Sequence, residues 1–306
     1  MSGSSSARAH TETWTVLRLM LWSADYLKTH GVPSARLDAE YLLSHVLGVG
    51  RLEMYLQHER PLTARELDDF RPLLKRRAKR EPLQYVLGRQ AFRNLDLEVR
   101  PGVLIPRPET ECLVEEVLTW AHGRGRADLV GLDVGTGSGA IALSLLAEGP
   151  FARFVGADVS PAALEVAARN RDALDMRERL DLRAGGLFES VRAGERFDVI
   201  VSNPPYVAEA ERPGLAPEVV DWEPAEALFG GSDGLAVIRE IVRRASTVLG
   251  PEGLLALEVG AEQANAVATL IEARGEYRDV GIRKDLAGKE RVVVATLAAM
   301  TNDRGG

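Results

Sequence analysis

The strongest constraint on the fold is the regular alternation of strand-like and helical segments in the larger, C-terminal part of this 306-residue chain. Short runs of aliphatic and β-branched residues alternate with longer segments whose apolar residues recur at helical spacing. Strands connected through helices pair in parallel, so the pattern predicts an α/β fold: a doubly wound, seven-stranded, mostly parallel sheet with helices on both faces. The strand-like runs are residues 129–134, 154–158, 180–183, 197–201, 253–259, 277–282 and 291–296.

The N-terminal part of the chain differs, because its apolar residues recur at helical spacing without strand-like alternation. This pattern predicts a small all-helical domain with one helix ending at Gly31, a second running from Ser34 to Gly48 and a third beginning at Thr63. Thr63 and Glu66 have the spacing of a capping box. We therefore expect a disordered tail at residues 1–10, a helical domain at 11–81, a linker or β-hairpin at 82–105, the α/β domain at 106–297 and a tail at 298–306.

Composition excludes several classes of function. The chain has no apolar run long enough to cross a membrane, and its formal charge of −7 argues against a protein that binds nucleic acid by coating phosphates. The basic run "KRRAKR" at residues 75–80 is interpreted as a solvated helix face, with a contact site for RNA or a protein partner as the alternative. A single cysteine, Cys112, excludes an internal disulfide, and no Cys/His spacing predicts a metal site.

The stretch "LDVGTGSGAIALSLL" places Gly135, Gly137 and Gly139 at a predicted strand-to-helix turn, with Thr136 and Ser138 between them. Missing side chains let a ligand approach the backbone there, and the helix N-terminus favours an anionic group. Asp158 ends the next predicted strand, where an acidic residue can bind both ribose hydroxyls of an adenosine. These elements predict an adenosine cofactor, and at this point they fit either NAD or S-adenosylmethionine.

A second motif, Asn203-Pro-Pro-Tyr206, follows the fourth predicted strand at the same edge of the sheet. An amide or aryl amine is a weak nucleophile, because its lone pair is delocalised, so a catalyst gains by accepting both of its N–H hydrogens. The Asn203 side-chain carbonyl and the Pro204 backbone carbonyl can be the two acceptors. Pro205 restricts the conformation of Pro204, and Tyr206 can stack on the planar group. The motif therefore predicts methyl transfer from a sulfonium cofactor to a planar nitrogen.

With these motifs the chain resembles the peptide chain release factor N5-glutamine methyltransferases, a family of class I S-adenosylmethionine-dependent methyltransferases with a Rossmann-like fold. The combination of "LIPRPETE" with Asn203-Pro-Pro-Tyr206 is the most specific part of the resemblance. Further family-like segments occur along almost the whole chain: "SARLDAEYLLSHVLG", "PLQYVLGRQAF", "EPAEALFGGSDGL", "LALEVGAEQ" and "KDLAGKERVVVA".

The resemblance implies methyl transfer to the side-chain amide of the Gln in the Gly-Gly-Gln motif of class 1 release factors, in support of translation termination. It implies a monomer in the cytoplasm whose helical domain helps to dock the release factor, with no membrane partner and no sequence-specific nucleic acid. Asn203, Pro204 and Tyr206 would be catalytic, and Pro205 would join them in binding substrate. The implied cofactor contacts are Gly135, Thr136, Gly137, Ser138, Gly139, Asp158, Leu187 and Asn203.

Two local features of the sequence, Gly186 and residues 106–111, bear on how the cofactor would be bound. Gly186 occupies a position where the family often has an acidic residue, which predicts weaker discrimination of the adenine. Residues 106–111 are expected to close over the cofactor, with Glu109 and Glu111 as favourable charges in the first turn of a helix.

The nearest alternative function is methylation of exocyclic amines of DNA or RNA bases. An adenosine-binding protein without turnover and a nucleotide-dependent oxidoreductase are the other two.

Overall fold

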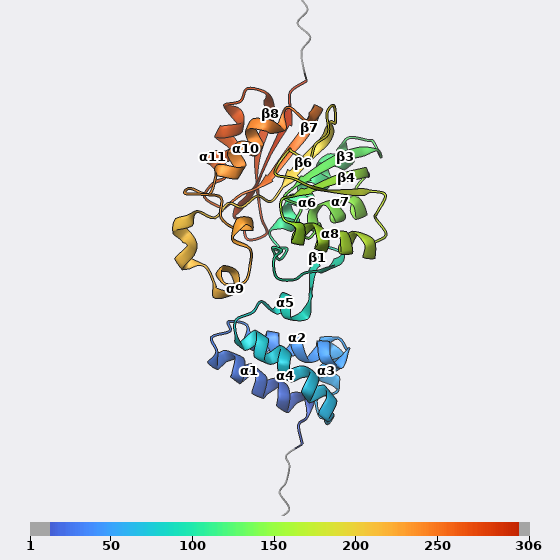
Figure 1. The fold of residues 1–306 in the computed structure, drawn as a ribbon, viewed down its shortest axis with the longest axis vertical. Helices are drawn as coiled ribbons and strands as arrows, with labels where there is room; N and C mark the ends of the chain where they lie inside the picture. The colour runs from blue at the N-terminus through green and yellow to red at the C-terminus, as the bar shows by residue number, and fades with distance from the viewer. Residues whose placement is uncertain (1–12, 300–306) are drawn as a thin grey trace, which may run out of the picture. The chain divides into compact units, whose positions relative to one another are not determined.

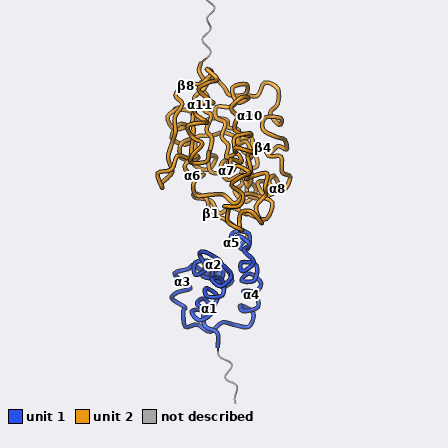
Figure 2. The backbone as a smooth tube through the Cα atoms, turned by 90° about the vertical axis from the view of Figure 1, so that its left-hand side faces the viewer, with its two compact units in different colours: residues 1–87 blue, residues 88–306 orange. Residues whose placement is uncertain are grey.

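The computed structural model describes residues 13–299, so the predicted tail at 1–10 and most of that at 298–306 lie outside the described residues. The chain divides into two compact units, one ending at Leu87 and the other beginning at Gly88 (Figure 2). The hairpin expected between two domains therefore belongs to the second unit. Of the described residues, no helix is long and apolar enough to span a bilayer.

The first unit is helical, and the three predicted helices are present. At the start of the third, the Glu66 N–H donates to Thr63 Oγ1 at 3.2 Å and the Thr63 N–H donates to Glu66 Oε2 at 2.8 Å, which is the predicted capping box. Fully buried Met20, Leu42 and Phe70 contribute to its apolar core. Two short helices, α3 and α5, were not predicted. The helices are α1 (Val16–Thr29), α2 (Ala35–Leu47), α3 (Arg51–Leu56), α4 (Ala64–Ala78) and α5 (Leu83–Leu87).

The basic run at residues 75–80 is only partly a solvated face. Lys75 and Lys79 are exposed on or next to α4, as expected. Arg77, however, is buried, and its Nε lies 2.6 Å from Asp38 Oδ2 on α2, so the interpretation was wrong at this position. Because Arg77 joins two helices of the unit, it contributes to the fold of the unit rather than to a charged outer surface.

The second unit contains the predicted seven-stranded sheet, in the order β5-β4-β3-β6-β7-β9-β8 (Figure 1). All neighbouring strands are parallel except β9, which pairs antiparallel with both β7 and β8. A separate antiparallel hairpin consists of β1 (Arg89–Phe92) and β2 (Leu95–Glu98). The sheet strands are β3 (Leu129–Val134), β4 (Phe151–Asp158), β5 (Leu180–Ala184), β6 (Phe197–Ser202), β7 (Leu249–Glu258), β8 (Tyr277–Lys284) and β9 (Glu290–Leu297).

Helices cover both faces of this sheet, as predicted (Figure 1). Apolar side chains of α6 and α7 pack with alternate residues of β3, β6 and β7 on one face, and those of α10 and α11 pack with the intervening residues on the other. The chain leaves β3 toward β4 on one side and later returns to β6 on the other. Strand order thus reverses between β3 and β6, the place where such sheets bind ligands. The helices are α6 (Thr110–Gly123), α7 (Ala140–Glu148), α8 (Pro161–Ala173), α9 (Pro217–Val220), α10 (Ala236–Ala245) and α11 (Ala264–Glu272).

Candidate active site

A cavity of about 300 Å³ lies at the carboxyl ends of β3, β4, β5 and β6. Its volume is at the lower end of the range for small-molecule sites. It brings together residues that are far apart in the sequence, including most of the predicted site. Gly139 and Tyr206 are the two predicted residues that do not line it. Those that do are Gly135, Thr136, Gly137, Ser138, Asp158, Leu187, Asn203, Pro204 and Pro205.

The glycine loop between β3 and α7 requires its glycines for backbone conformation. Gly135, Gly137 and Gly139 have φ values of 74°, 56° and 83°, in the left-handed region that disfavours residues with a Cβ. The Gly137 N–H donates to Asp158 Oδ2 at 2.8 Å, and the Ser160 N–H donates to Asp158 Oδ1 at 2.9 Å. Asp158 thus holds the glycine loop and the start of α8 together, in addition to the ribose contact predicted for it.

Beneath the glycine loop lies Asp133, a residue that the sequence interpretation missed. Its side chain is fully buried on β3, Oδ2 accepts the Thr136 hydroxyl at 2.8 Å, and Oδ1 has no hydrogen-bond partner in the described structure. Burial raises its pKa to about 7. The signal in the sequence was a single acidic residue within the apolar run "LVGLDV", directly before the loop.

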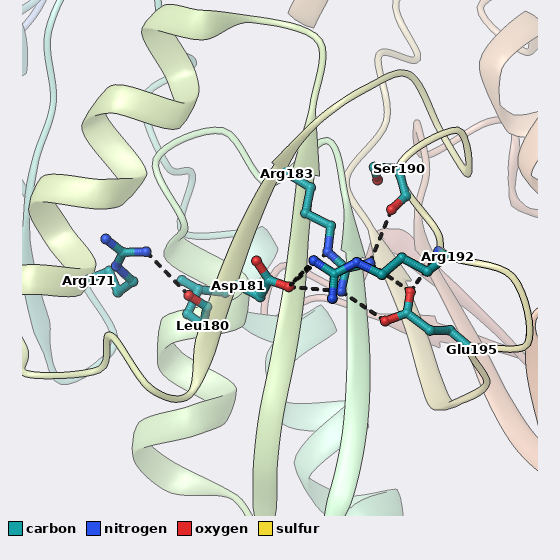
Figure 3. A network of polar contacts seen from close by, with 7 residues as sticks. All are labelled: Arg171, Leu180, Asp181, Arg183, Ser190, Arg192 and Glu195. Carbon is teal, nitrogen blue, oxygen red and sulfur yellow. Dashed lines mark hydrogen bonds and ion pairs between the residues drawn. The ribbon is translucent and has the colours of Figure 1, made fainter.

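The wall formed by the loop after β5 is fixed by Arg183 (Figure 3). Its guanidinium donates to both carboxylate oxygens of Glu195, at 2.6 and 2.8 Å, and to the Ser190 carbonyl at 3.1 Å. The ion pair with Arg183 lowers the pKa of Glu195 to about 2. Leu187, on this loop, lines the cavity with a φ of 49°, which is uncommon for leucine, so the surrounding contacts must maintain its conformation.

Asn203 is the first residue after β6, and its side-chain amide has a defined orientation. Nδ2 donates to Thr110 Oγ1 at 3.1 Å, and Thr110 is buried at the start of α6. Since the amide nitrogen is engaged in this bond, the Asn203 side-chain carbonyl is left as an acceptor. Thr110 also lines the cavity, and sequence reasoning did not single it out. Pro204 is buried, follows Asn203 directly and also lines the cavity.

Two glycines allow the Asn203-Pro-Pro-Tyr206 backbone to lie where it does. A Cβ on Gly230 would be 2.4 Å from the Pro205 carbonyl oxygen, and a Cβ on Gly234 would be 2.1 Å from that of Tyr206. Gly234 also has a φ of 75°. The Gln263 side chain donates to the Tyr206 carbonyl at 2.9 Å. Backbone contacts from a distant segment thus fix the motif.

The segment at residues 106–111 forms another wall of the cavity through Pro106 and Thr110. Arg107 forms an ion pair with buried Glu223 at 2.5 Å, and the Ile105 N–H donates to the same carboxylate at 3.1 Å. Glu111 lies in the first turn of α6, as predicted, whereas Glu109 is at the N-cap position before it.

Among residues 13–299, no three His, Cys, Asp or Glu side chains are grouped so that they could hold a metal ion.

Comparison with known proteins identifies first the class and then the family. Residues 110–224 match the model described as Methyltransferase small domain, and residues 18–88 match that described as PrmC N-terminal domain. The solved structure of a methyltransferase from Pyrococcus furiosus has a similar fold, with a TM-score of 0.50 and 22% identity over 69% of this chain and 92% of that chain. The second unit therefore has a methyltransferase fold.

Curated relatives identify the family within this class. The release factor glutamine methyltransferase of Geobacter sulfurreducens is 44% identical over 92% of this chain and 96% of its own length. The protein of the same name from Cereibacter sphaeroides is 43% identical over 89% of this chain and 95% of its own length. The chain belongs to the release factor glutamine methyltransferase family.

The close approach of Gly234 to Tyr206 predicts the effect of a single methyl group. Gly234→Ala should move the Asn203-Pro-Pro-Tyr206 backbone, because the added Cβ meets a backbone oxygen. A displacement of this kind reduces methyl transfer by on the order of 100-fold. The matched control is Gly214→Ala, at an exposed position where a Cβ meets nothing within 4 Å, and it should transfer methyl at the wild-type rate. Equal rates for the two variants would contradict the prediction.

Burial of Asp133 predicts a dependence of stability on pH. The folded-state pKa of about 7 lies above the ordinary aspartate value, so the folded protein binds this proton more tightly than the unfolded chain. The resulting stabilisation is present below about pH 4 and is lost as pH rises through 7, by about 1.4 kcal/mol per unit of pKa difference. Between pH 5 and 8, the free energy of unfolding measured by urea titration should fall less for Asp133→Asn than for wild type. Parallel curves for the two proteins would exclude this role.

Proposed function

We propose that this protein transfers a methyl group from S-adenosylmethionine to the side-chain amide nitrogen, N5, of the Gln in the Gly-Gly-Gln motif of class 1 peptide chain release factors. The names of the relatives support the substrate. The observation that carries the chemistry is the orientation of Asn203, whose amide nitrogen is engaged by Thr110 and whose carbonyl is left to accept a substrate N–H.

The residues around the cavity fit S-adenosylmethionine. The glycine loop lets a ligand approach the protein backbone closely. Leu187 and Ile141 provide apolar walls, and Asp158 provides a carboxylate where a ribose is expected. Gly135 to Ser138, Asp158, Leu187 and Asn203, which line the cavity, would contact the cofactor. The bound cofactor would supply a methyl group on a sulfonium sulfur, which departs as a neutral thioether, an excellent leaving group.

The substrate amide would lie against Asn203-Pro-Pro-Tyr206. The Asn203 side-chain carbonyl and the Pro204 backbone carbonyl each accept one N–H, which leaves the nitrogen lone pair directed away from both. Pro205 restricts the conformation of Pro204, so the second acceptor is rigid. Tyr206 forms the adjacent wall for the planar amide. These residues contribute orientation and polarisation, and none of them needs to act as a strong base.

The remaining parts of the proposal concern the rest of the chain. The helical unit would help to bind the release factor, and the match of residues 18–88 to a domain model of this family supports that role. Residues 106–111 would order over the bound cofactor, and the ion pair between Arg107 and Glu223 would hold them. We propose a monomeric protein that acts in the cytoplasm on a protein partner.

The first experiment measures transfer of labelled methyl from S-adenosylmethionine to a class 1 release factor, to its Gly-Gly-Gln variant with Gln→Ala, and to duplex DNA. The proposal expects label only in the intact release factor. Label in DNA would support methylation of base amines instead, and tight cofactor binding without label in any substrate would support a non-catalytic adenosine-binding protein.

Asn203→Ala tests the amide acceptor directly. The variant should lower kcat by about 100-fold or more, the loss found when one hydrogen-bonding group that stabilises a transition state is removed. Asn265→Ala, at an exposed position of α11, is the control and should leave kcat unchanged. A fall in cofactor affinity without a fall in kcat would contradict the role of Asn203 as a substrate acceptor.

Gly186→Asp tests the missing acidic side chain. A Cβ at this position meets its nearest atom at 3.4 Å, so the substitution is sterically allowed, although Glu189 lies nearby. The variant should bind S-adenosylmethionine more tightly in calorimetry, because it supplies an acceptor for the adenine amino group. Combining it with Glu189→Gln removes a neighbouring like charge and should increase the gain. Unchanged affinity in both variants would count against the interpretation.

A further inference from the structure

Glu258 is a buried acidic residue that the proposed mechanism does not yet use. It is the last residue of β7, in the segment "LALEVGAEQ", and its side chain is fully buried. Leu257 pairs with Ser202 of β6, so Glu258 and Asn203 are the next residues on two adjacent parallel strands. An acidic side chain is thus placed inside the protein directly beside the substrate-binding motif.

Glu258 is hydrogen-bonded to one residue of that motif. The Tyr206 hydroxyl donates to Glu258 Oε1 at 3.2 Å, whereas Oε2 has no hydrogen-bond partner in the described structure. The Thr110 hydroxyl lies near the same carboxyl group, without a hydrogen bond to Oε2, and lowers the pKa of Glu258. Thr110 Oγ1 meanwhile accepts the Asn203 amide N–H, so its own proton is free for donation toward Glu258.

The charges around Glu258 come from several elements. Burial is the largest influence and raises its pKa to about 7. Arg291 on β9 opposes this shift, although its guanidinium is also paired with Asp285 at 3.2 Å, and Glu109 at the start of α6 adds to the shift. The nearby Cys112 thiol on α6 has a raised pKa, caused chiefly by burial.

We propose that Glu258 is a positioning residue, whose carboxylate holds the Tyr206 ring through its hydroxyl and, when ionised, attracts the Thr110 hydroxyl that accepts from the Asn203 amide. The proposal rests on the proposed function, because it assigns how the two acceptor-bearing walls are kept in place. An ionised carboxylate accepts from both hydroxyls at once, whereas a protonated one must donate with one oxygen and competes with them. The orientation of Asn203 then depends on the charge of Glu258.

The kinetic test compares Glu258→Gln with Tyr206→Phe and with the double variant. Each single change should lower kcat about tenfold, because it removes an orienting hydrogen bond. The double variant should be no slower than the slower single variant, since both changes break the same contact. The Kd for S-adenosylmethionine should stay within about twofold of wild type, because Glu258 does not line the cavity. Glu262→Gln, an exposed position four residues further, is the matched control.

The pH dependence separates positioning from a merely structural role. Wild-type kcat should fall as pH drops from 8 to 6, with an inflection near 7, and the Glu258→Gln profile should lack this inflection. A Glu258→Gln variant with wild-type kcat and an unchanged profile would overturn the proposal. Reduced kcat with strictly additive effects of Tyr206→Phe would do so as well.

A spectroscopic readout keeps the inference testable if the substrate proves different. The Asn203 side-chain NH₂ resonances, assigned by their loss in Asn203→Ala, should shift with pH around 7 in wild type and stay constant in Glu258→Gln. No methyl transfer by the wild type to the release factor would refute the proposed function alone. Resonances that do not titrate in wild type would refute the coupling of Glu258 to Asn203, whatever the substrate.

Discussion

The parallel pairing of β3 with β6 is the constraint on which the site depends. Gly131, Leu132 and Asp133 pair with Val199, Ile200 and Val201, so the two strands end side by side. The glycine loop leaves the end of one strand, and Asn203 leaves the end of the other. Because strand order reverses between them, no crossover helix lies above this edge and a ligand can be bound there. The glycine loop and Asn203, separated by more than sixty residues in the sequence, thus become neighbours.

The same edge contains two acidic side chains that are unfavourable in a protein interior. Asp133 ends close to the glycine loop and Glu258 lies beside Asn203, and burial raises the pKa of each to about 7. Each has one carboxylate oxygen bonded to a hydroxyl and one without a hydrogen-bond partner in the described structure. Such groups lower stability above neutral pH. Both lie at strand ends that border the cavity, and the hydroxyl bonded to each belongs to a loop of the site, Thr136 in one case and Tyr206 in the other.

The sequence alone predicts the sheet well, because most of its strands are apolar runs and most are separated by helices, and this pattern allows few topologies. It also predicts the glycine loop, Asp158 and Asn203, which carry local motifs. Short α3 and α5 have too few turns for a periodic signal. Buried Arg77 could not be separated from its exposed basic neighbours by composition. Thr110 and Glu258 have ordinary surroundings in the sequence, and their role emerges only when α6 and β7 meet at the end of β6.

Gly230 and Gly234 illustrate a constraint that acts over distance. Neither belongs to the Asn203-Pro-Pro-Tyr206 motif, yet a side chain on either would collide with a carbonyl oxygen of that motif. The prolines make the motif rigid, so it cannot relax around an added methyl group as a flexible loop would. A rigid motif therefore requires small residues in the segment packed against it. The glycines in "FGGSDG" and the prolines after Asn203 together fix the backbone of residues 203–206.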